Sequence, residues 1–363
     1  MAPLDWGLGH ATRTIPVIRE FLSRGWTVDL AVSGSVSALY EKEFPGLRRI
    51  RIPGYAIRYP ARGFEMPFWL LKNYRRIANV IRDEHLIAES LVKVNAYDAV
   101  FSDNRFGFYS SRAHSVYLTH QARIAFPSPF SIFEDLGVAW HSRKMSHFDS
   151  LWIPDFPEFP GLAGKLSHVS TNRVLEFVGP LSRFSGLELP SPPSDKKFRF
   201  AAILSGPEPM RTSFEKALLA AFEKIPGEHL LVRGLPGSSE IPFSPKNVTV
   251  YNHLDTVAFS KAIQNAESVV SRPGYSTVMD MIYLGADCIF VPTPGQTEQV
   301  YLGKALRDSG KASYLQQTEI SAERLQSLAR KKHSPWKWKV REDLLKSAVN
   351  RLAMKLEKIA QER

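Results

Sequence analysis

From Val269 onward, the chain has the pattern of a buried strand, a tight turn and a helix. Gly274 lies in the turn, where a glycine accepts backbone angles closed to other residues and lets a ligand approach closely. Ser276 and Thr277 follow at the predicted start of the helix, which they can cap. The free N–H groups and the dipole of such a helix start favour a phosphate. The stretch therefore predicts a phosphate site.

An acidic residue and a glutamine-containing loop extend this candidate site. Asp280 lies four residues after Ser276, on the same predicted helix face, where a carboxylate suits ribose hydroxyls. An apolar strand at 288–291 leads to a loop, and such loops border the ligand crevice of open α/β sheets. The polar residues of this loop are Gln296, Glu298 and Gln299. Strand–turn–helix units are also common in domains that bind nothing, so a structural turn is the alternative.

A second glycine loop lies near the N-terminus, after a very short predicted strand. Gly7 and Gly9 nearly match the dinucleotide fingerprint, but the third glycine and the acidic residue after the second strand are missing. A nicotinamide or flavin dehydrogenase is therefore disfavoured. His10 lies where this loop meets a predicted helix, and a histidine there can face a crevice and titrate near neutral pH. Local capping or packing of His10 is the alternative.

Polar side chains also follow two further predicted strands. Asp103 and Asn104 come after a strand at 98–102, and His120 follows a strand at 115–118. The carboxyl ends of parallel strands form the functional edge of an α/β sheet. We expect these side chains to meet the N-terminal histidine at one crevice, with a role in turn structure as the alternative.

Charge and composition narrow the class of partner. A net charge of +11 favours an anionic partner, and no nucleic-acid-binding motif is recognisable, which disfavours nucleic acid. The single cysteine, Cys288, suits a reducing cytoplasm, and neither a signal peptide nor a long apolar run is visible. No metal-ligand spacing occurs, so no metal is expected. Residues 66–77 combine aromatic and basic side chains, as in a helix at a membrane surface or in an ordinary packed amphipathic helix.

Strands and helices alternate in two series, which predicts an α/β fold of two Rossmann-like parallel-sheet domains that face each other across a cleft. The expected organisation is an N-terminal domain at 1–182, a proline-rich linker at 183–197 and a C-terminal domain at 198–337. A final amphipathic helix at 338–363 is expected to pack back on the N-terminal domain.

Several motifs in order resemble those of the GT-B glycosyltransferases, specifically family 28, which the peptidoglycan N-acetylglucosaminyltransferase typifies. The N-terminal loop ending in His10 is similar to that family's glycine loop, and the stretch 272–280 to its nucleotide-sugar signature. The loop 296–299 resembles its glutamine loop, and Ser205 and Gly206 with Arg211 resemble the loop that opens its second domain.

The resemblance implies a GT-B fold and an inverting, metal-independent transfer of a hexose or N-acetylhexosamine from a UDP-sugar to an acceptor hydroxyl. It implies that no cofactor is needed besides the donor substrate. The second domain would hold UDP, and His10 would face the reacting sugar or the acceptor. The implied contacts are Gly274, Ser276 and Thr277 with the diphosphate, Asp280 with ribose, and Gln299 with the sugar.

Three positions depart from the family pattern. Asp280 stands where the family usually has Glu, Val300 follows Gln299 where the family has a second Gln, and Pro273 replaces a small polar residue.

For the chemistry, His10 is the first candidate base and Asp103 the second. Arg272 or Arg211, with the helix start at Ser276, would neutralise the leaving diphosphate. Asn104, His120 and the glycine loop would lie on the acceptor side. The basic charge and the segment 66–77 suggest a lipid-linked acceptor at the cytoplasmic face of the plasma membrane. Two other functions stay open: a UDP-sugar 2-epimerase, and a catalytically silent nucleotide-sugar- or lipid-binding protein.

Overall fold

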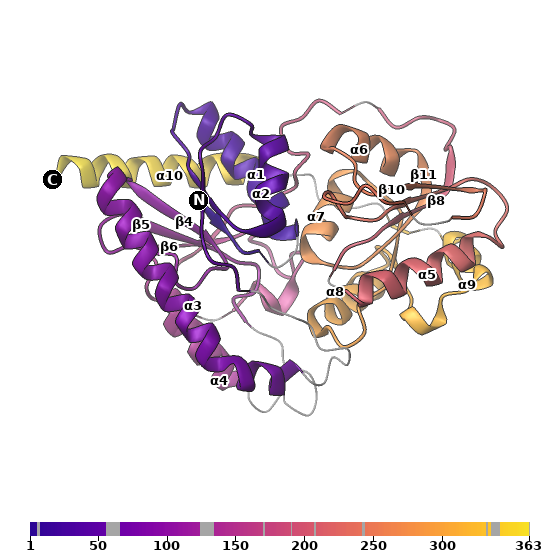
Figure 1. Cartoon of the computed structure of the whole chain (residues 1–363), viewed down its shortest axis with the longest axis horizontal. Helices are drawn as coiled ribbons and strands as arrows, with labels where there is room; N and C mark the ends of the chain where they lie inside the picture. Colours follow the sequence, from indigo (N-terminus) through magenta and orange to yellow (C-terminus); the bar gives the residue numbers. More distant parts are fainter. Residues whose placement is uncertain are drawn as a thin grey trace. The chain divides into compact units, whose positions relative to one another are not determined.

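The computed structural model describes residues 1–5, 8–55, 66–123, 134–169, 171–189, 191–206, 208–241, 244–331, 333–334 and 342–362. The chain divides into two compact units, each an α/β unit with a parallel sheet (Figure 1). Unit 1 comprises Met1–Ile57, Pro67–Arg183 and Val340–Arg363, and unit 2 comprises Arg58–Met66 and Phe184–Lys339.

The sheet of unit 1 has the strand order β1-β4-β5-β6-β7, and all of its pairings are parallel. A short parallel pair, β2-β3, continues it, because the Ala31 amide donates to the Met1 carbonyl at 2.8 Å. The strands are β1 Ala2–Pro3, β2 Leu30–Val32, β3 Arg49–Arg51, β4 Ala99–Asp103, β5 His114–Leu118, β6 Ser150–Ile153 and β7 Leu175–Phe177. The resulting order is that of a doubly wound sheet, in which ligands bind outside the strands' carboxyl ends.

The helices of unit 1 present apolar stripes to this sheet. They are α1 Leu8–Ser23, α2 Gly34–Glu43, α3 Met66–Asn95, α4 Glu134–Met145, the 3-10 turn η3 Gly164–Leu166 and α10 Glu342–Gln361. In α1, Ile15 and Ile18 are fully buried, one helical turn apart. The final helix, α10, packs against α1 and β7 and buries Ala348 and Val349. It therefore belongs to the core of unit 1.

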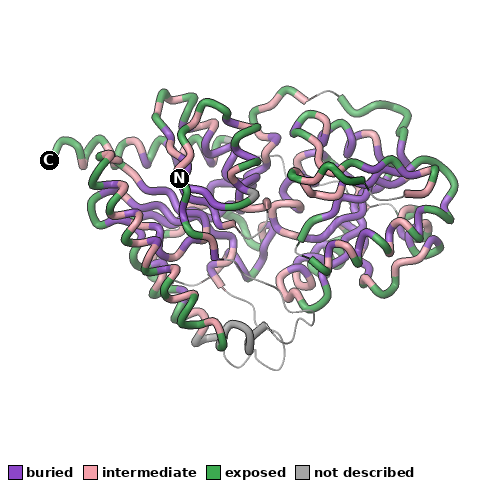
Figure 2. Tube along the Cα trace, in the orientation of Figure 1, coloured by how far each residue is buried: buried purple, intermediate pink, exposed green. Residues whose placement is uncertain are grey.

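Unit 2 has a six-stranded parallel sheet in the order β10-β9-β8-β11-β12-β13. Its strands are β8 Phe198–Ile203, β9 His229–Val232, β10 Val248–Tyr251, β11 Ala266–Ser271, β12 Cys288–Phe290 and β13 Ser313–Tyr314. Its helices are α5 Met210–Phe222, α6 Thr256–Gln264, α7 Tyr275–Tyr283, α8 Thr297–Asp308, the 3-10 turn η4 Gln317–Glu319 and α9 Ala322–Ala329. The central strands are buried while the helices expose one side to solvent (Figure 2).

Local sequence signals account for several element boundaries. The edge strand β10 alternates buried and exposed residues, and Asp255 caps α6 by accepting the Ala258 amide at 2.8 Å. The sequence analysis did not anticipate α2 and β3, which are short. The segment 66–77 opens the 30-residue helix α3, but the side chains of 66–71 lie outside the described residues. Within the described part of the chain, no helix is long and apolar enough to cross a membrane.

Candidate functional site

The residues predicted to act in unit 1 come together at the carboxyl end of β4. Pro3 of β1 pairs with Asp103, the last residue of β4, so the chain enters α1 beside this strand end. His10, in the first turn of α1, has its Nδ1 at 3.2 Å from Asp103 Oδ1. Arg13 donates from Nε to Asp103 Oδ2 at 2.9 Å, and its Nη2 also binds this carboxylate. One carboxylate therefore holds both a histidine and an arginine of α1.

His120, two residues past β5, joins this cluster through Arg13. Arg13 Nη1 lies 2.7 Å from His120 Nδ1. A guanidinium can only donate, so Nδ1 of His120 accepts, and a neutral His120 carries its proton on Nε2. His10, Asp103, Arg13 and His120 thus form one hydrogen-bonded chain across α1 and the ends of β4 and β5.

The charges in this cluster compensate one another. Asp103 is fully buried and Arg13 is 1% exposed. Burial alone would raise the pKa of Asp103, but the Arg13 guanidinium and His10 hold it below its usual value. Burial of the imidazole and the charge of Arg13 lower the pKa of His10, and they outweigh Asp103, which raises it. At neutral pH, the cluster therefore contains a carboxylate, a guanidinium and a neutral His10.

This geometry distinguishes the two candidate bases. Asp103 is inaccessible and its oxygens are engaged, so its position suits orienting a neighbour and not taking a substrate proton. His10 keeps 15% of its side chain exposed. With its Nδ1 proton directed at the carboxylate, its Nε2 lone pair is the group that can accept a proton.

The acceptor-side residues around this cluster have mixed roles. Asn104 has a φ of 55°, in the left-handed region that Asn tolerates better than most residues, and its amide donates to Leu118 O at 3.2 Å. Gly9 accepts a hydrogen bond from Thr12 Oγ1 at 3.0 Å and so supports the first turn of α1. Gly7 lies outside the described residues.

In unit 2, the predicted phosphate turn leads into α7. Gly274 is the residue before the helix, with φ −69° and ψ 143°. The prediction that it adopts angles reserved for glycine is wrong, because any residue adopts this conformation. A Cβ on Gly274 would meet only Thr277 Oγ1, at an ordinary 3.8 Å. Backbone geometry therefore does not require a glycine at this position, and the missing side chain leaves open space at the helix start.

The helix side chains named from the sequence lie near this start. The helix begins at Tyr275 and not at Ser276, so Ser276 and Thr277 lie in the first turn, half-buried, and do not cap it. Asp280 follows one turn later and is 3% exposed. The first turn of α7 thus presents backbone N–H groups and two hydroxyl-bearing residues, a combination suited to an anion.

Arg272 does not have the position expected of a phosphate ligand. Its guanidinium is 1% exposed and lies 3.9 Å from the ring centroid of Phe214. Its Nη1 donates to the carbonyls of Val291 and Pro292 at 3.0 and 2.8 Å, and its Nη2 donates to Gln317 Oε1 at 2.5 Å. Burial lowers its pKa to about 9, so it stays charged at neutral pH. Arg272 fastens the loop after β11 to the loop after β12.

Arg211 is likewise engaged inside unit 2. It is 4% exposed and donates to Glu208 Oε1 at 2.6 Å and to Glu215 Oε2 at 2.5 Å. Glu215 also accepts from Arg233 Nε at 2.9 Å. These ion pairs satisfy Arg211 at the start of α5, so the expected role in neutralising a diphosphate is not supported by its position.

The other residues predicted to contact the donor lie in or next to the loops after β8 and β12. Gln299 accepts the Thr293 amide on Oε1 at 2.7 Å and so holds the loop between β12 and α8. Gln296 precedes α8 and Glu298 lies in its first turn. Because β11 and β12 are paired neighbours, the helices that follow them, α7 and α8, begin at the same sheet edge. Ser205 and Gly206 lie exposed after β8, and Gly206 has a φ of 102°, which favours glycine.

Arg13 takes part in the His10–Asp103 cluster but was not predicted from the sequence. Its only sequence signal is its spacing of three residues from His10, which places both on one face of a helix. Such pairs are common on solvated helices, so the spacing alone does not indicate a buried charge. Among the described residues, no group of three or more His, Cys, Asp or Glu side chains is arranged to hold a metal ion.

Comparisons with known proteins give matches to glycosyltransferases. Residues 236–343 match the glycosyltransferase family 28 C-terminal domain. An uncharacterized glycosyltransferase of Methanosarcina mazei is 23% identical over 330 residues, which cover 84% of this chain and 82% of the relative.

A shorter match of higher identity is to a Pasteurella multocida enzyme, the UDP-N-acetylglucosamine–N-acetylmuramyl-(pentapeptide) pyrophosphoryl-undecaprenol N-acetylglucosamine transferase. It is 37% identical over 83 residues, which cover 23% of each chain. Among solved structures, the spinosyn rhamnosyltransferase SpnG complexed with thymidine diphosphate superposes with a TM-score of 0.62 at 13% identity, over 98% of this chain and 95% of that one.

The two parallel α/β units and the whole-chain superposition define the GT-B fold, and this confirms the predicted fold class. The chain is a glycosyltransferase of the GT-B type, and its residues 236–343 match the family 28 C-terminal domain.

The position of Arg272 generates a prediction about stability. We expect Arg272→Met to lower the free energy of unfolding by about 1–3 kcal/mol, because two buried carbonyls lose their donors. Urea unfolding measures this change. Arg307→Gln, at a half-exposed arginine of α8, is the control and should change stability by less than about 0.5 kcal/mol. Wild-type stability together with lost nucleotide affinity in Arg272→Met would instead place this arginine at the ligand.

Proposed function

We propose that this protein is an inverting glycosyltransferase that moves a hexose or N-acetylhexosamine from a UDP-sugar to an acceptor hydroxyl. The observation that carries the proposal is the hydrogen bond between His10 and the buried Asp103. It gives the N-terminal unit a neutral imidazole next to a strand's carboxyl end. The C-terminal unit supplies the nucleotide-sugar site through its family 28 domain.

In the proposed reaction, His10 Nε2 removes the proton of the acceptor hydroxyl. The acceptor oxygen then forms a bond to the anomeric carbon, from the side opposite to UDP, and the carbon–oxygen bond to UDP breaks. The electron pair of that bond leaves on the diphosphate. Asp103 stabilises the imidazolium that forms, and Arg13 keeps the Asp103 carboxylate ionised and in place. In this proposal, His10 is the base and Asp103 supports it, in place of the hypothesis that Asp103 is itself a base.

The donor is proposed to bind at the start of α7. Two lines of observation support this: the space beside Gly274, and the two hydroxyl-bearing residues in the first turn. The helix start would take up the charge of the leaving diphosphate, since Arg272 and Arg211 are engaged elsewhere. We assign ribose to Asp280 and the sugar to Gln299, whose Oε1 holds the adjoining loop.

We further propose a lipid-linked acceptor and a peripheral location at the cytoplasmic face of the plasma membrane. The Pasteurella multocida relative acts, by its name, on a pyrophosphoryl-undecaprenol acceptor, and it matches this chain over 83 residues. The net charge of +11 favours an anionic surface. The sugar of that relative's donor, N-acetylglucosamine, is the first donor sugar to test.

A donor screen with a product assay tests the proposal. Saturating UDP-sugar, at 100 times its dissociation constant, should stabilise the protein by about 2.7 kcal/mol in thermal unfolding, more than TDP- or GDP-sugars at equal concentration. UDP release should then require an acceptor. A new sugar isomer formed without acceptor would establish an epimerase instead, and tight UDP binding without turnover of any donor would establish a binding protein.

Replacement of the proposed base should separate chemistry from binding. We expect His10→Ala to lower kcat by about 10²–10⁴-fold, while UDP affinity stays within about twofold because the donor binds the other unit. Because burial and Arg13 lower the pKa of His10, the pKa of the acid limb in the pH profile of kcat/KM should lie below the usual histidine value of about 6.5. Asp103→Asn should lower the pKa of that limb further, since the substitution removes the charge that raises the pKa of His10. An unchanged rate in His10→Ala would exclude His10 from the chemistry.

The open space at Gly274 supplies a matched test of the donor site. Gly274→Ala should keep wild-type stability, because its Cβ meets only Thr277 Oγ1 at 3.8 Å. It should weaken UDP-sugar binding about tenfold or more, because a methyl group there interferes with charge-assisted bonds to the diphosphate. Gly237→Ala, where a Cβ meets nothing within 4 Å, is the control for both measurements. Equal affinities of the two variants, measured by calorimetry, would contradict a phosphate at this position.

A further inference from the structure

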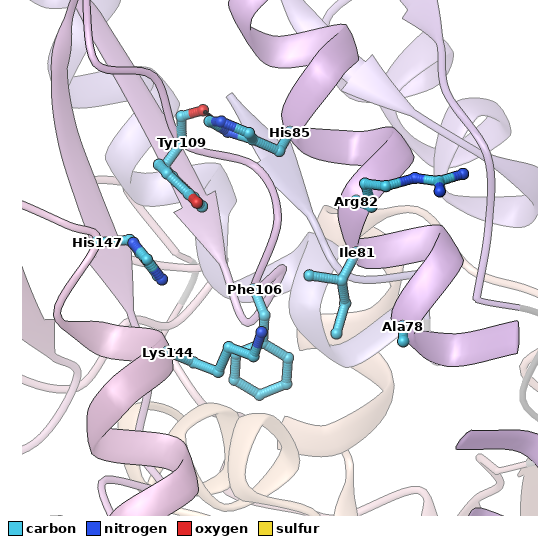
Figure 3. A pocket seen from close by; sticks show the side chains of 8 residues that line it. All are labelled: Ala78, Ile81, Arg82, His85, Phe106, Tyr109, Lys144 and His147. Atoms are coloured by element: carbon cyan, nitrogen blue, oxygen red, sulfur yellow. Dashed lines mark hydrogen bonds between the residues drawn. The ribbon is translucent and has the colours of Figure 1, made fainter. Parts of the chain in front are cut away.

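Unit 1 has a pocket apart from the His10–Asp103 cluster, between α3, α4 and the connection from β4 to β5 (Figure 3). This connection, residues 104–113, is described throughout and contains no helix, so it leaves the groove between α3 and α4 open. The pocket has a volume of about 220 Å³. Its lining residues are Ala78, Ile81, Arg82, His85, Phe106, Tyr109, Lys144 and His147.

A stack of three rings builds one wall of the pocket. The Tyr109 ring lies between the imidazoles of His85 and His147, with centroid distances of 4.2 and 4.7 Å and interplanar angles of 24° and 9°. His85 Nδ1 also lies 3.1 Å from the Tyr109 carbonyl, which can only accept, so this nitrogen carries a proton. The stack therefore holds two imidazoles in fixed orientations beside the cavity.

The polar lining carries one sign of charge. Lys144 comes from α4, His147 from the turn after it and His85 from α3, whereas the Arg82 guanidinium points away from the Tyr109 ring, at the rim (Figure 3). None of the eight lining residues is acidic. Burial, together with the nearby charges of Lys144, His85 and Arg143, lowers the pKa of His147. These basic groups repel one another, and an anion in the pocket would relieve that repulsion.

The acidic residues near the lining already have other partners. Asp83 of α3 pairs with Arg82 at 3.1 Å. Glu89 of the same helix accepts from the Ser111 amide at 2.6 Å and lies 3.5 Å from Arg112 Nε. Neither carboxylate is among the lining residues, so neither pairs with Lys144 inside the pocket.

We propose that this pocket binds the phosphate group of a second ligand, independently of the donor site in unit 2. Lys144 and His147 provide the donors, and Ile81 and Phe106 provide an apolar wall for the part that bears the phosphate. The volume is below the roughly 300–1,000 Å³ of pockets that enclose a drug-sized ligand. It suits a phosphate or diphosphate head group and not a whole nucleotide-sugar. The source is either a soluble phosphate compound or a lipid head group.

Titration of the full-length protein with inorganic diphosphate tests the shared chemistry. We expect the imidazole NMR signals of His85 and His147 to shift on saturation, and the pKa of His147 to rise because the anion stabilises its charged form. Lys144→Gln should weaken this binding about tenfold, the loss expected for one charge-assisted hydrogen bond. Lys93→Gln, which removes the same charge from an exposed position of α3, should leave it unchanged. His147→Gln is the second pocket variant.

Vesicles distinguish the two sources. Binding to vesicles of phosphatidylcholine with phosphatidic acid, but not of phosphatidylcholine alone, supports a lipid head group if Lys144→Gln weakens it and Lys93→Gln does not. Diphosphate binding with that same dependence on Lys144, without vesicle binding, supports a soluble phosphate compound. The proposal is overturned if neither histidine signal responds and no binding depends on Lys144. Because the readouts are local to α3 and α4, they are separate from the tests of sugar transfer.

Discussion

The burial of one carboxylate determines how the N-terminal unit is organised. Asp103 is fully removed from solvent at the end of β4, and an uncompensated charge there would cost several kcal/mol. Arg13 supplies the opposite charge and His10 a further hydrogen bond, and both belong to α1. The requirement to compensate Asp103 therefore binds the start of α1 to the central strand. The same requirement sets the orientation and protonation of the imidazole that we propose as the base.

The C-terminal unit uses a buried arginine for a comparable purpose. The guanidinium of Arg272 stacks on Phe214 and donates to carbonyls of the loop after β12. It thus connects two loops at the carboxyl edge of the sheet. In both units, a buried charged side chain positions a strand end, while a neighbouring element presents the groups that are available to a ligand.

Parts of the fold follow from local patterns. The alternation of buried and exposed residues in β10 and the cap of α6 by Asp255 are such local features, because each depends on neighbouring residues. The meeting of His10 with Asp103 was also expected, since parallel strands place their carboxyl ends at one edge. The short elements α2 and β3 were not predicted, because their length offers too few periods of alternation. The start of α7 was misplaced by one residue, since Ser276 resembles a cap but Gly274 precedes the helix.

The sequence alone determined the alternation of strands and helices, the two α/β series and the set of polar residues at strand ends. It did not determine which charged side chains face inward. The hydrogen-bond partners of Arg13 lie 90 and 107 residues away in the sequence. The guanidinium of Arg272, which was expected to neutralise a diphosphate, instead donates to carbonyls 19 and 20 residues further along the chain. Hydrophobic periodicity gives information about neighbours within a few residues. The partner of a buried charge is determined by the packing of distant segments. The tertiary structure therefore determined the partners of these charged side chains, whereas the sequence determined the sheet edge near which they lie.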